Sequence, residues 1–278
     1  MRQSNAGALP YKCAIRYSLR ALLLLAFALQ TGSALAQAAD EPGLYMGLFG
    51  GLGALDSTSL RQRGNVILPH PLPRLPIDAD GSTQRQDLAV GGIQLGYEWA
   101  PWALGARWGL RPAAEIEGLY LGKHTPEGTM PVSPRFLGTQ YVTMPMTGAV
   151  LLANAVGTLQ TPYSDRFLPY VGLGAGIARL SIQGSDSANP SEPGINHFNA
   201  DPDASSTALA LQFKVGIRGK LSRNVSLFTE YRHLRIDPTD YTFGRTDYPG
   251  LHLPTDTWQV DMGRLKYNLF VAGLRYQF

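Results

Sequence analysis

The sequence predicts an all-β fold, an eight-stranded antiparallel transmembrane β-barrel. Three observations carry this prediction. Segments of alternating apolar and polar residues recur along the chain, charged residues make up only 16% of it while glycines number 31, and long polar connections alternate with short ones. Alternation places successive side chains on opposite faces of a strand. Strands with one face in lipid and the other in a polar interior show this pattern.

The N-terminal segment, residues 1–36, has the layout of a cleaved secretory signal. It holds four basic residues and no acid, then an apolar run over 21–29 and the cleavage pattern Ala34-Leu35-Ala36. The apolar run is shorter than the roughly 18 residues that a spanning helix needs. Cleavage lowers the formal net charge of +3 by four, to −1, and removes Cys13, the single cysteine. We therefore expect an exported mature chain over 37–278, and its charge gives no indication of nucleic-acid binding.

Eight stretches of the mature chain have strand patterning. They are 44–54, 88–99, 112–123, 141–155, 169–183, 207–221, 225–236 and 263–278. The stretch 207–221 is the clearest, because Leu211 and Phe213 fall on one face while Gln212 and Lys214 fall on the other. The stretch 141–155 is the weakest, because an interior proline, Pro145, cannot donate a ladder hydrogen bond.

The connections between these stretches alternate in length. The long ones follow the first, third, fifth and seventh strands, have loop composition, and span about 55–87, 124–140, 184–206 and 237–262. An outer-membrane barrel with both termini in the periplasm has short periplasmic turns and long extracellular loops. The sequence thus predicts a multi-pass protein of the outer membrane with four long loops outside the cell.

The last stretch, 263–278, illustrates the two-faced pattern. Its even-numbered residues from Phe270 to Phe278 are apolar or aromatic, and its odd-numbered residues include Arg275. The final strand of a soluble sandwich would read the same way, so the rest of the chain decides that the even face meets lipid. Leu269 and Val271 fall on the inner face, where a polar lumen does not explain them.

Charged residues gather on the inner faces of the predicted strands. They are Glu98, Glu115, Glu117, Lys214, Arg218, Lys220, Glu230, Arg232 and Arg275. Eight strands enclose an interior only wide enough for side chains, and buried charges there must pair. We expect structural ion-pair ladders that fill the lumen, with Glu230 near Arg275 or Arg218. The alternative is a gated pore lined by the same charges.

Three strand segments carry a resemblance to a known family. They are PYVGLGAGIARL (169–180), LFTEYRHLRI (227–236) and YNLFVAGLRYQF (267–278). The chain from about residue 43 resembles the small outer-membrane β-barrels of Gram-negative bacteria, which include the OmpA transmembrane domain, opacity-type adhesins and surface-antigen barrels. The resemblance implies that Phe278, with Tyr276, is the signal read by the outer-membrane assembly machinery. It also implies contact with outer-membrane lipids and lipopolysaccharide. The long first connection and the poorly patterned stretch 141–155 depart from the family.

The resemblance implies a structural or surface-display protein, adhesin-like through loops that contact a host or envelope ligand. The alternatives are a narrow porin-like channel for small solutes and a lipid A-modifying enzyme. In the family that this chain resembles, the deacylase and phospholipase members use a His-x-Ser arrangement, in which the imidazole activates the hydroxyl. None of the five histidines here has a serine two positions further on. We therefore expect no catalytic, cofactor-binding or metal-binding residues, and a monomer.

Overall fold

The computed structural model describes residues 42–105, 107–250 and 252–278. The predicted signal segment, 1–36, lies outside these residues. Residues Asp40–Phe278 form one compact unit. Among the residues described, no helix is long and apolar enough to cross a membrane.

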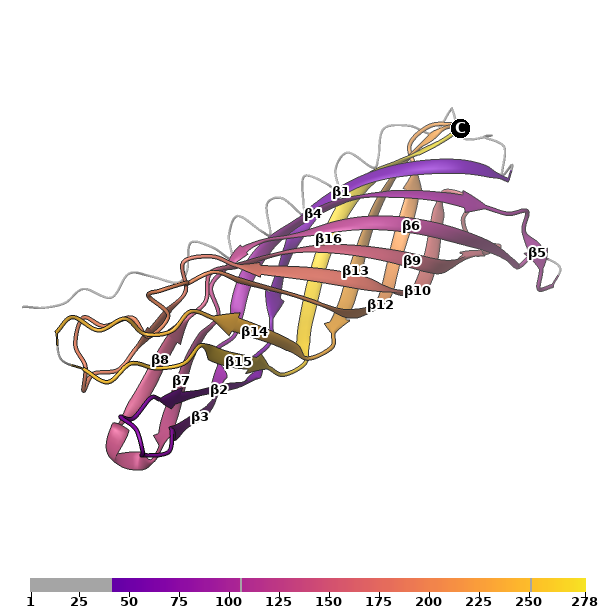
Figure 1. Ribbon diagram of the computed structural model, residues 1–278. Helices are drawn as coiled ribbons and strands as arrows, with labels where there is room; N and C mark the ends of the chain where they lie inside the picture. The colour runs from indigo at the N-terminus through magenta and orange to yellow at the C-terminus, as the bar shows by residue number, and fades with distance from the viewer. Residues whose placement is uncertain (1–41, 106, 251) are drawn as a thin grey trace, which may run out of the picture. The chain divides into compact units, whose positions relative to one another are not determined.

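Eight long strands form a closed antiparallel barrel (Figure 1). They are β1 (Gly43–Leu55), β4 (Gln86–Glu98), β6 (Gly109–His124), β9 (Met146–Gln160), β10 (Phe167–Ile182), β12 (Ala204–Lys220), β13 (Val225–Ile236) and β16 (Leu265–Gln277). Each strand pairs with the next in this order, and β1 pairs with β16, so that no edge is left open. The predicted fold class is confirmed.

The fourth predicted strand, 141–155, is wrong in its bounds. The structure divides it into a short strand, β8 (Thr139–Thr143), and the barrel strand β9, which continues to Gln160. Pro145 lies at the break; its ring removes a ladder donor, while its carbonyl oxygen accepts a hydrogen bond from the amide of Gln183 at 3.0 Å. Alternation counted across the proline therefore joined residues of two different sheets.

The four long connections, which have loop composition in the sequence, contain regular structure. Together they contribute the seven strands β2 (Ser59–Val66), β3 (Leu75–Thr83), β7 (Glu127–Ser133), β8, β11 (Asp186–Ala188), β14 (Thr239–Phe243) and β15 (Trp258–Met262). These strands pair in the order β11-β8-β7-β3-β2-β15-β14 at the end of the barrel away from the C-terminus (Figure 1). We call this second sheet the extension sheet. Three of its pairings, β11–β8, β7–β3 and β2–β15, join connections that are far apart in sequence, so no local pattern reveals them, whereas β2–β3, β7–β8 and β14–β15 each lie within one connection.

The short connections hold little regular structure. The turn between β4 and β6 contains only the two-residue strand β5 (Trp102–Ala103). The 3₁₀ turn Arg135–Leu137 belongs instead to the long connection after β6. Trp102 is 61% exposed, and Trp108 makes an edge-to-face contact with Tyr163 of the next short turn. Aromatic side chains therefore gather at this end of the barrel, as they do at membrane interfaces.

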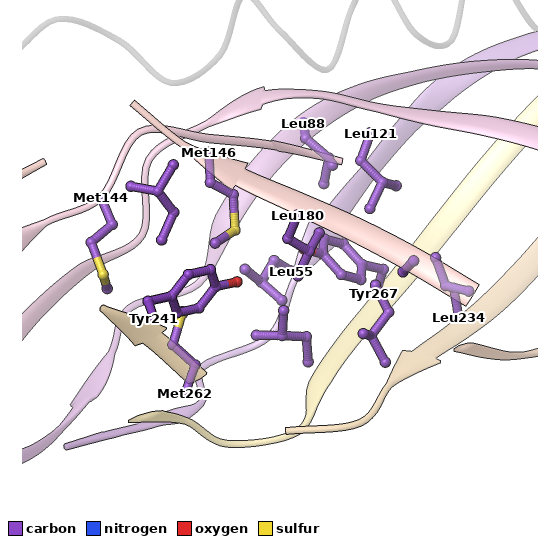
Figure 2. Packing of buried hydrophobic residues seen from close by; sticks show 14 of the residues in the cluster. Leu55, Leu88, Leu121, Met144, Met146, Leu180, Leu234, Tyr241, Met262 and Tyr267 are labelled. Carbon is purple, nitrogen blue, oxygen red and sulfur yellow. The ribbon is translucent and has the colours of Figure 1, made fainter. Parts of the chain in front are cut away.

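An apolar core runs from the part of the lumen nearest the extension sheet into that sheet (Figure 2). Leu55, Leu121, Leu180 and Tyr267 from four barrel strands are fully buried in it, and Tyr241 of β14 belongs to the same cluster. Leu269 and Val271 also belong to it, with exposures of 0% and 3%. Their cross-strand partners on β13 are Arg232 and Glu230, so these two residues lie where the apolar core meets the lumen charges, which the sequence pattern alone did not explain.

Candidate functional site in the barrel lumen

The lumen nearest the C-terminus is organised around Glu98, at the end of β4. Arg218 of β12 forms a two-pronged contact with its carboxylate, with nitrogen–oxygen distances of 2.9 and 3.3 Å. Arg275 of β16 and Arg111 of β6 approach the same carboxylate at 3.1 and 3.3 Å. All four side chains are buried. Three guanidinium groups from three strands thus enclose one carboxylate, so loss of Glu98 would leave three buried cations without this shared partner.

A second cluster lies further into the barrel and centres on Glu117, which is fully buried. Lys214 contacts Glu117 at 3.2 Å and Glu115 at 2.5 Å. Arg232 bridges Glu117 and Glu230. Each carboxylate therefore meets at least one cation, which is the condition under which buried charges are tolerated.

Neutral side chains complete the hydrogen bonding of this second cluster. The hydroxyl groups of Tyr45 and Tyr170 donate to Glu115 and Glu230, at 3.0 and 2.8 Å. Asn154 donates to Glu115 at 3.0 Å, and Gln212 donates to the Asn154 side-chain oxygen at 3.2 Å. The network therefore connects strands from opposite walls of the barrel.

Glycines and aromatic rings make room for these large side chains. A Cβ atom on Gly96 would lie 2.4 Å from the Tyr45 ring, and one on Gly174 would lie 1.9 Å from the side-chain oxygen of Asn154. The guanidinium of Arg275 lies 3.5 Å from the ring centre of Tyr45, a cation–π contact. The glycines on the inner face are therefore sites where a neighbouring side chain crosses the strand.

The space left inside this network is small. A cavity of about 20 Å³ lies between Tyr45, Gln94, Glu115, Lys214 and Glu230. That volume is sufficient for about one water molecule. At this level the lumen is filled by side chains. Toward the extension sheet, the apolar core shown in Figure 2 fills it.

The structure places the predicted lumen residues as follows. Eight are buried on the inner wall, namely Glu98, Glu115, Glu117, Lys214, Arg218, Glu230, Arg232 and Arg275. Lys220 is half-buried. The expected pairing of Glu230 is wrong: Glu230 contacts Arg232 on its own strand, two residues away, whereas Arg218 and Arg275 both contact Glu98.

Sequence reasoning missed several members of the network. Arg111 has the same strand parity as Glu115, but it preceded the predicted start of that strand. Tyr45, Asn154 and Tyr170 are uncharged, so a search for inner-face charges passed over them. Gln212 falls on the inner face with Lys214, but it was left out of the network for the same reason. Inward parity would have found Tyr45, which alternates with exposed apolar neighbours.

The predicted assembly residues lie at the end of the outward face of β16. Phe278 and Tyr276 are 66% and 45% exposed, and their rings meet edge to face at 5.1 Å. The Phe278 amide donates to the Leu44 carbonyl oxygen at 3.0 Å. Their role as an assembly signal stays a prediction.

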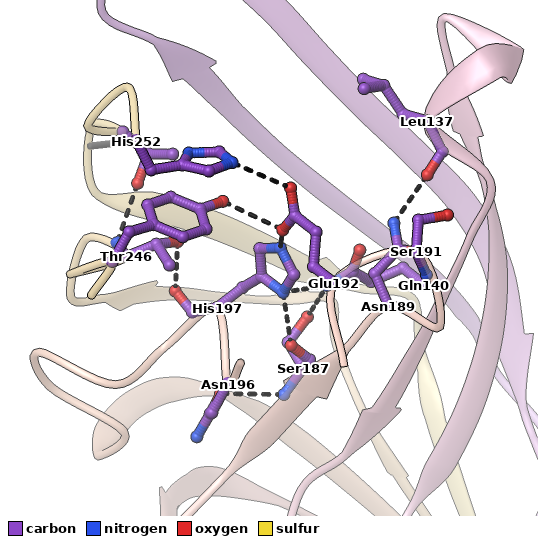
Figure 3. Close-up of polar contacts among 12 residues, drawn as sticks. Leu137, Gln140, Ser187, Asn189, Ser191, Glu192, Asn196, His197, Thr246 and His252 are labelled. Atoms are coloured by element: carbon purple, nitrogen blue, oxygen red, sulfur yellow. Dashed lines mark hydrogen bonds and ion pairs between the residues drawn. The ribbon is translucent and has the colours of Figure 1, made fainter. Parts of the chain in front are cut away.

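A polar cluster in the extension sheet brings together a serine, a histidine and a glutamate (Figure 3). The two ring nitrogens of His197 face the main-chain oxygen of Ser187 at 2.7 Å and the carboxylate of Glu192 at 2.8 Å. The Ser187 hydroxyl is fully buried and exchanges hydrogen bonds with Gln140 and Gln62. The hydroxyl therefore binds two amides and has no opening toward a substrate.

This polar cluster fastens the two ends of the extension sheet. Tyr248 donates to Glu192 at 3.1 Å, and Thr246 donates to the main-chain oxygen of His197 at 2.9 Å. Nearby, Phe198 stacks on Phe243 of β14, with ring centres 4.3 Å apart. The segment after β11 thus closes the gap between β11 and β14, the first and last strands of the sheet. Within the described part of the chain, no group of three or more His, Cys, Asp or Glu residues is placed to hold a metal ion.

The closed barrel, with an apolar outer wall and charges inside, defines a transmembrane β-barrel protein. The chain matches the outer membrane protein beta-barrel domain family over residues 21–278, and it belongs to this family. Membership places the protein in the outer membrane.

Several solved structures resemble the chain. Neisserial surface protein A is 15% identical, with 85% of this chain and 97% of that chain covered and a TM-score of 0.38. The outer membrane protein OprG from Pseudomonas aeruginosa is 13% identical, with coverage of 86% and 98% and a TM-score of 0.45. The attachment invasion locus protein Ail of Yersinia pestis is 12% identical, with coverage of 81% and 98% and a TM-score of 0.26. A search of curated proteins found no match.

Proposed function

We propose that the protein is a closed outer-membrane barrel that displays the extension sheet at the cell surface, where the sheet contacts a host or envelope ligand. One observation carries this proposal. The four long connections form a single seven-stranded sheet whose inner face, with Leu60, Met130 and Val260, is buried in a core. A surface built on such a sheet is preorganised, so a ligand does not have to order it on binding.

The outer face of the extension sheet supports this proposal because it is polar and held in place. Arg61 on β2 contacts Asp78 and Asp80 on β3, at 3.1 and 3.4 Å. Arg63 on β2 contacts Asp261 on β15. Two hollows, of about 420 and 370 Å³, lie beside these ion pairs. Both are lined by charged side chains, among them Arg63 and Asp78 in the first and Arg61 and Asp80 in the second. Such a face suits a polar ligand better than an apolar one.

The orientation is testable because the mature chain has no cysteine of its own. Thr242→Cys lies on the exposed face of β14, and Arg223→Cys lies in the short turn between β12 and β13. We expect a membrane-impermeant maleimide to label the Thr242 variant in intact cells and the Arg223 variant only after lysis. The reverse pattern would place the extension sheet in the periplasm and end the proposal.

The filled lumen supports a barrel that does not conduct, in preference to the narrow channel. We expect the refolded protein to give no reproducible current steps in planar bilayers at neutral pH. Regular steps that scale with salt concentration would favour the channel, because they require a continuous water path past Glu98 and Glu117. The buried Ser187 hydroxyl likewise supports a protein without hydrolytic activity. Mass spectra of lipid A from expressing cells test that proposal, and a changed lipid A would contradict it.

Ligand contact requires a separate comparison. Cells that express the intact protein should adhere to host-cell monolayers or immobilised matrix protein more than cells expressing a variant with Arg61→Gln and Asp80→Asn. The two substitutions remove one cross-strand ladder without altering the apolar core. Equal adhesion of the two strains, at equal surface expression, would count against this face as the contact site.

A further inference from the structure

The outward face formed by β13 and β16 changes chemistry in steps along the barrel. From the end near the C-terminus, its directly opposed pairs are Leu227–Leu274, Thr229–Ala272, Tyr231–Phe270, His233–Asn268 and Arg235–Lys266. The face is thus first apolar, then aromatic, then polar and finally cationic. The same order is found in a bilayer leaflet, from the hydrocarbon through the interface to the charged headgroups.

The aromatic and polar pairs mark where the hydrocarbon ends. The rings of Tyr231 and Phe270 are 5.2 Å apart, and the Tyr231 hydroxyl donates to the Asn268 side-chain oxygen at 2.7 Å. His233 Nδ1 lies 3.0 Å from the same oxygen, and the Asn268 amide donates to Asp56 at 2.9 Å. The cationic pair follows two residues further along each strand, which is about 7 Å at the rise of a β-strand. Arg235 and Lys266 therefore lie at the level of the lipid headgroups if the hydrocarbon ends at the aromatic pair.

The cationic pair is unusual because its two members are alike in charge. Arg235 and Lys266 lie directly opposite each other on adjacent strands, an arrangement that destabilises a sheet unless an anion lies between the charges. A third cation, Arg264, lies two residues from Lys266 on the same face.

Two carboxylates face these cations. The carboxylate of Asp237 lies 3.5 Å from the guanidinium of Arg235 and 3.6 Å from that of Arg264. The carboxylate of Asp56 accepts a hydrogen bond from the Asn268 side chain. Within the described residues, Lys266 has no ion-pair partner, and the group of five charges is net positive. The position that an anion would fill is therefore the one between Arg235 and Lys266.

We propose that this face binds an anionic phosphorylated lipid of the outer leaflet, with Arg235 and Lys266 on a phosphate group and Tyr231 and Phe270 against its acyl chains. Arginine binds phosphate through two parallel hydrogen bonds and lysine binds it as a point charge. The occupant is a lipid because the cations continue directly from a surface that faces hydrocarbon. The inference deepens the proposed function and rests on its orientation, which sets this end of the barrel in the outer leaflet.

The test is native mass spectrometry of the detergent-solubilised barrel, titrated with diphosphorylated lipid A and with zwitterionic phosphatidylcholine. The double variant Arg235→Gln, Lys266→Gln keeps polar side chains and removes both charges. A basic residue near an anionic membrane surface contributes a factor of about five in affinity, so the double variant should bind lipid A about 25-fold more weakly. Phosphatidylcholine binding should be unchanged.

Arg179→Gln is the matched control. Arg179 is an exposed, outward-facing residue of β10 at the same end of the barrel, and its cross-strand partners are Ala149 and Thr207 instead of a second cation. We expect this variant to bind lipid A no more than about fivefold more weakly than the parent protein, because it removes one basic residue instead of two. Heat-modifiable gel mobility confirms that each variant is folded.

Three outcomes would overturn the inference. They are an affinity of the double variant within twofold of the parent, an equal loss in the Arg179 variant, and displacement of lipid A by inorganic phosphate at the same concentration, which would assign the site to a free anion. The purified protein binds lipid regardless of its orientation in the cell. A wrong orientation would therefore appear in the cysteine labelling and leave these titrations unaffected.

Discussion

The barrel wall and the extension sheet alternate their side chains in the same way but with opposite polarity. On the barrel, the outward residues are apolar and exposed, such as Leu48 at 65% and Leu173 at 66%, while the inner residues include Glu117 and Arg232 at 0%. On the extension sheet, the outward residues are Arg61 and its acidic partners, and the inner residues are apolar. Each face therefore matches the medium it meets, lipid or water, and the strand period is common to both regions.

The comparison also shows what fills a narrow barrel. The inner faces of the barrel strands are charged near the C-terminus and apolar near the extension sheet, where the lumen joins the core of that sheet. Charge inside the barrel is thus confined to the two clusters around Glu98 and Glu117, away from the extension sheet. Four predictions test this division, beginning with the largest expected effect.

Arg232→Met should cost about 3–5 kcal/mol in the free energy of unfolding, because it leaves the buried carboxylates Glu117 and Glu230 without their shared cation. Arg63→Met, which breaks the half-exposed pair with Asp261 on the extension sheet, should cost far less. Urea denaturation of both variants refolded in lipid vesicles measures the difference. Similar costs would mean that the lumen charges are solvated.

Leu121→Ala and Leu60→Ala should each cost about 2–5 kcal/mol, because each removes a fully buried side chain from one continuous apolar core. Leu121 belongs to a barrel strand and Leu60 to the extension sheet. The same denaturation assay applies, with gel mobility and proteolysis as separate reports on the two regions. Loss of the extension sheet in the Leu60 variant without any effect on the barrel would show that the core is divided.

Leu173→Arg should cost about 2–4 kcal/mol, because it places a charge in the hydrocarbon at a central position of the outer wall. Thr242→Arg adds the same side chain to an outward, exposed position of the extension sheet and should be close to neutral. Vesicle refolding yields and denaturation midpoints compare the two. A neutral Leu173 variant would contradict the assignment of this face to lipid.

The smallest predicted effect concerns His124, the last residue of β6, beyond the apolar belt of the outer wall. Burial lowers the pKa of its ring below the ordinary value of about 6.5. Above that value the ring is neutral in both states and pH has no effect through it. As the pH falls through about 6.5, the unfolded chain takes up the proton first, so stability falls and then levels off below the folded-state pKa.

His124→Gln removes this titration. The difference in unfolding free energy between the parent and the variant should therefore shrink from pH 8 to pH 5. A difference that stays constant over this range would show that the ring titrates equally in both states.

Much of the barrel was predictable because strand parity is a local property. The alternation over 207–221 and 263–278 assigned the correct residues to the lumen, and the positions of Glu98, Glu115 and Glu117 followed from parity as well. The pairing of these charges was not predictable, because it depends on stagger between strands: Arg218 and Arg275 reach Glu98, whereas Glu230 is held by its neighbour Arg232.

The sequence by itself determined that the chain is a two-faced β-barrel with charges inside, since the period of two, the sparse use of charge and the alternating lengths of the connections are all visible in it. Only the tertiary structure decided that the long connections form a sheet and that Leu269 and Val271 belong to the buried apolar cluster. The tertiary structure also placed Arg235 of β13 directly opposite Lys266 of β16. The physical reason is that these features depend on partners brought together by strand register, and a residue's own neighbours in sequence do not specify its register with a strand far along the chain.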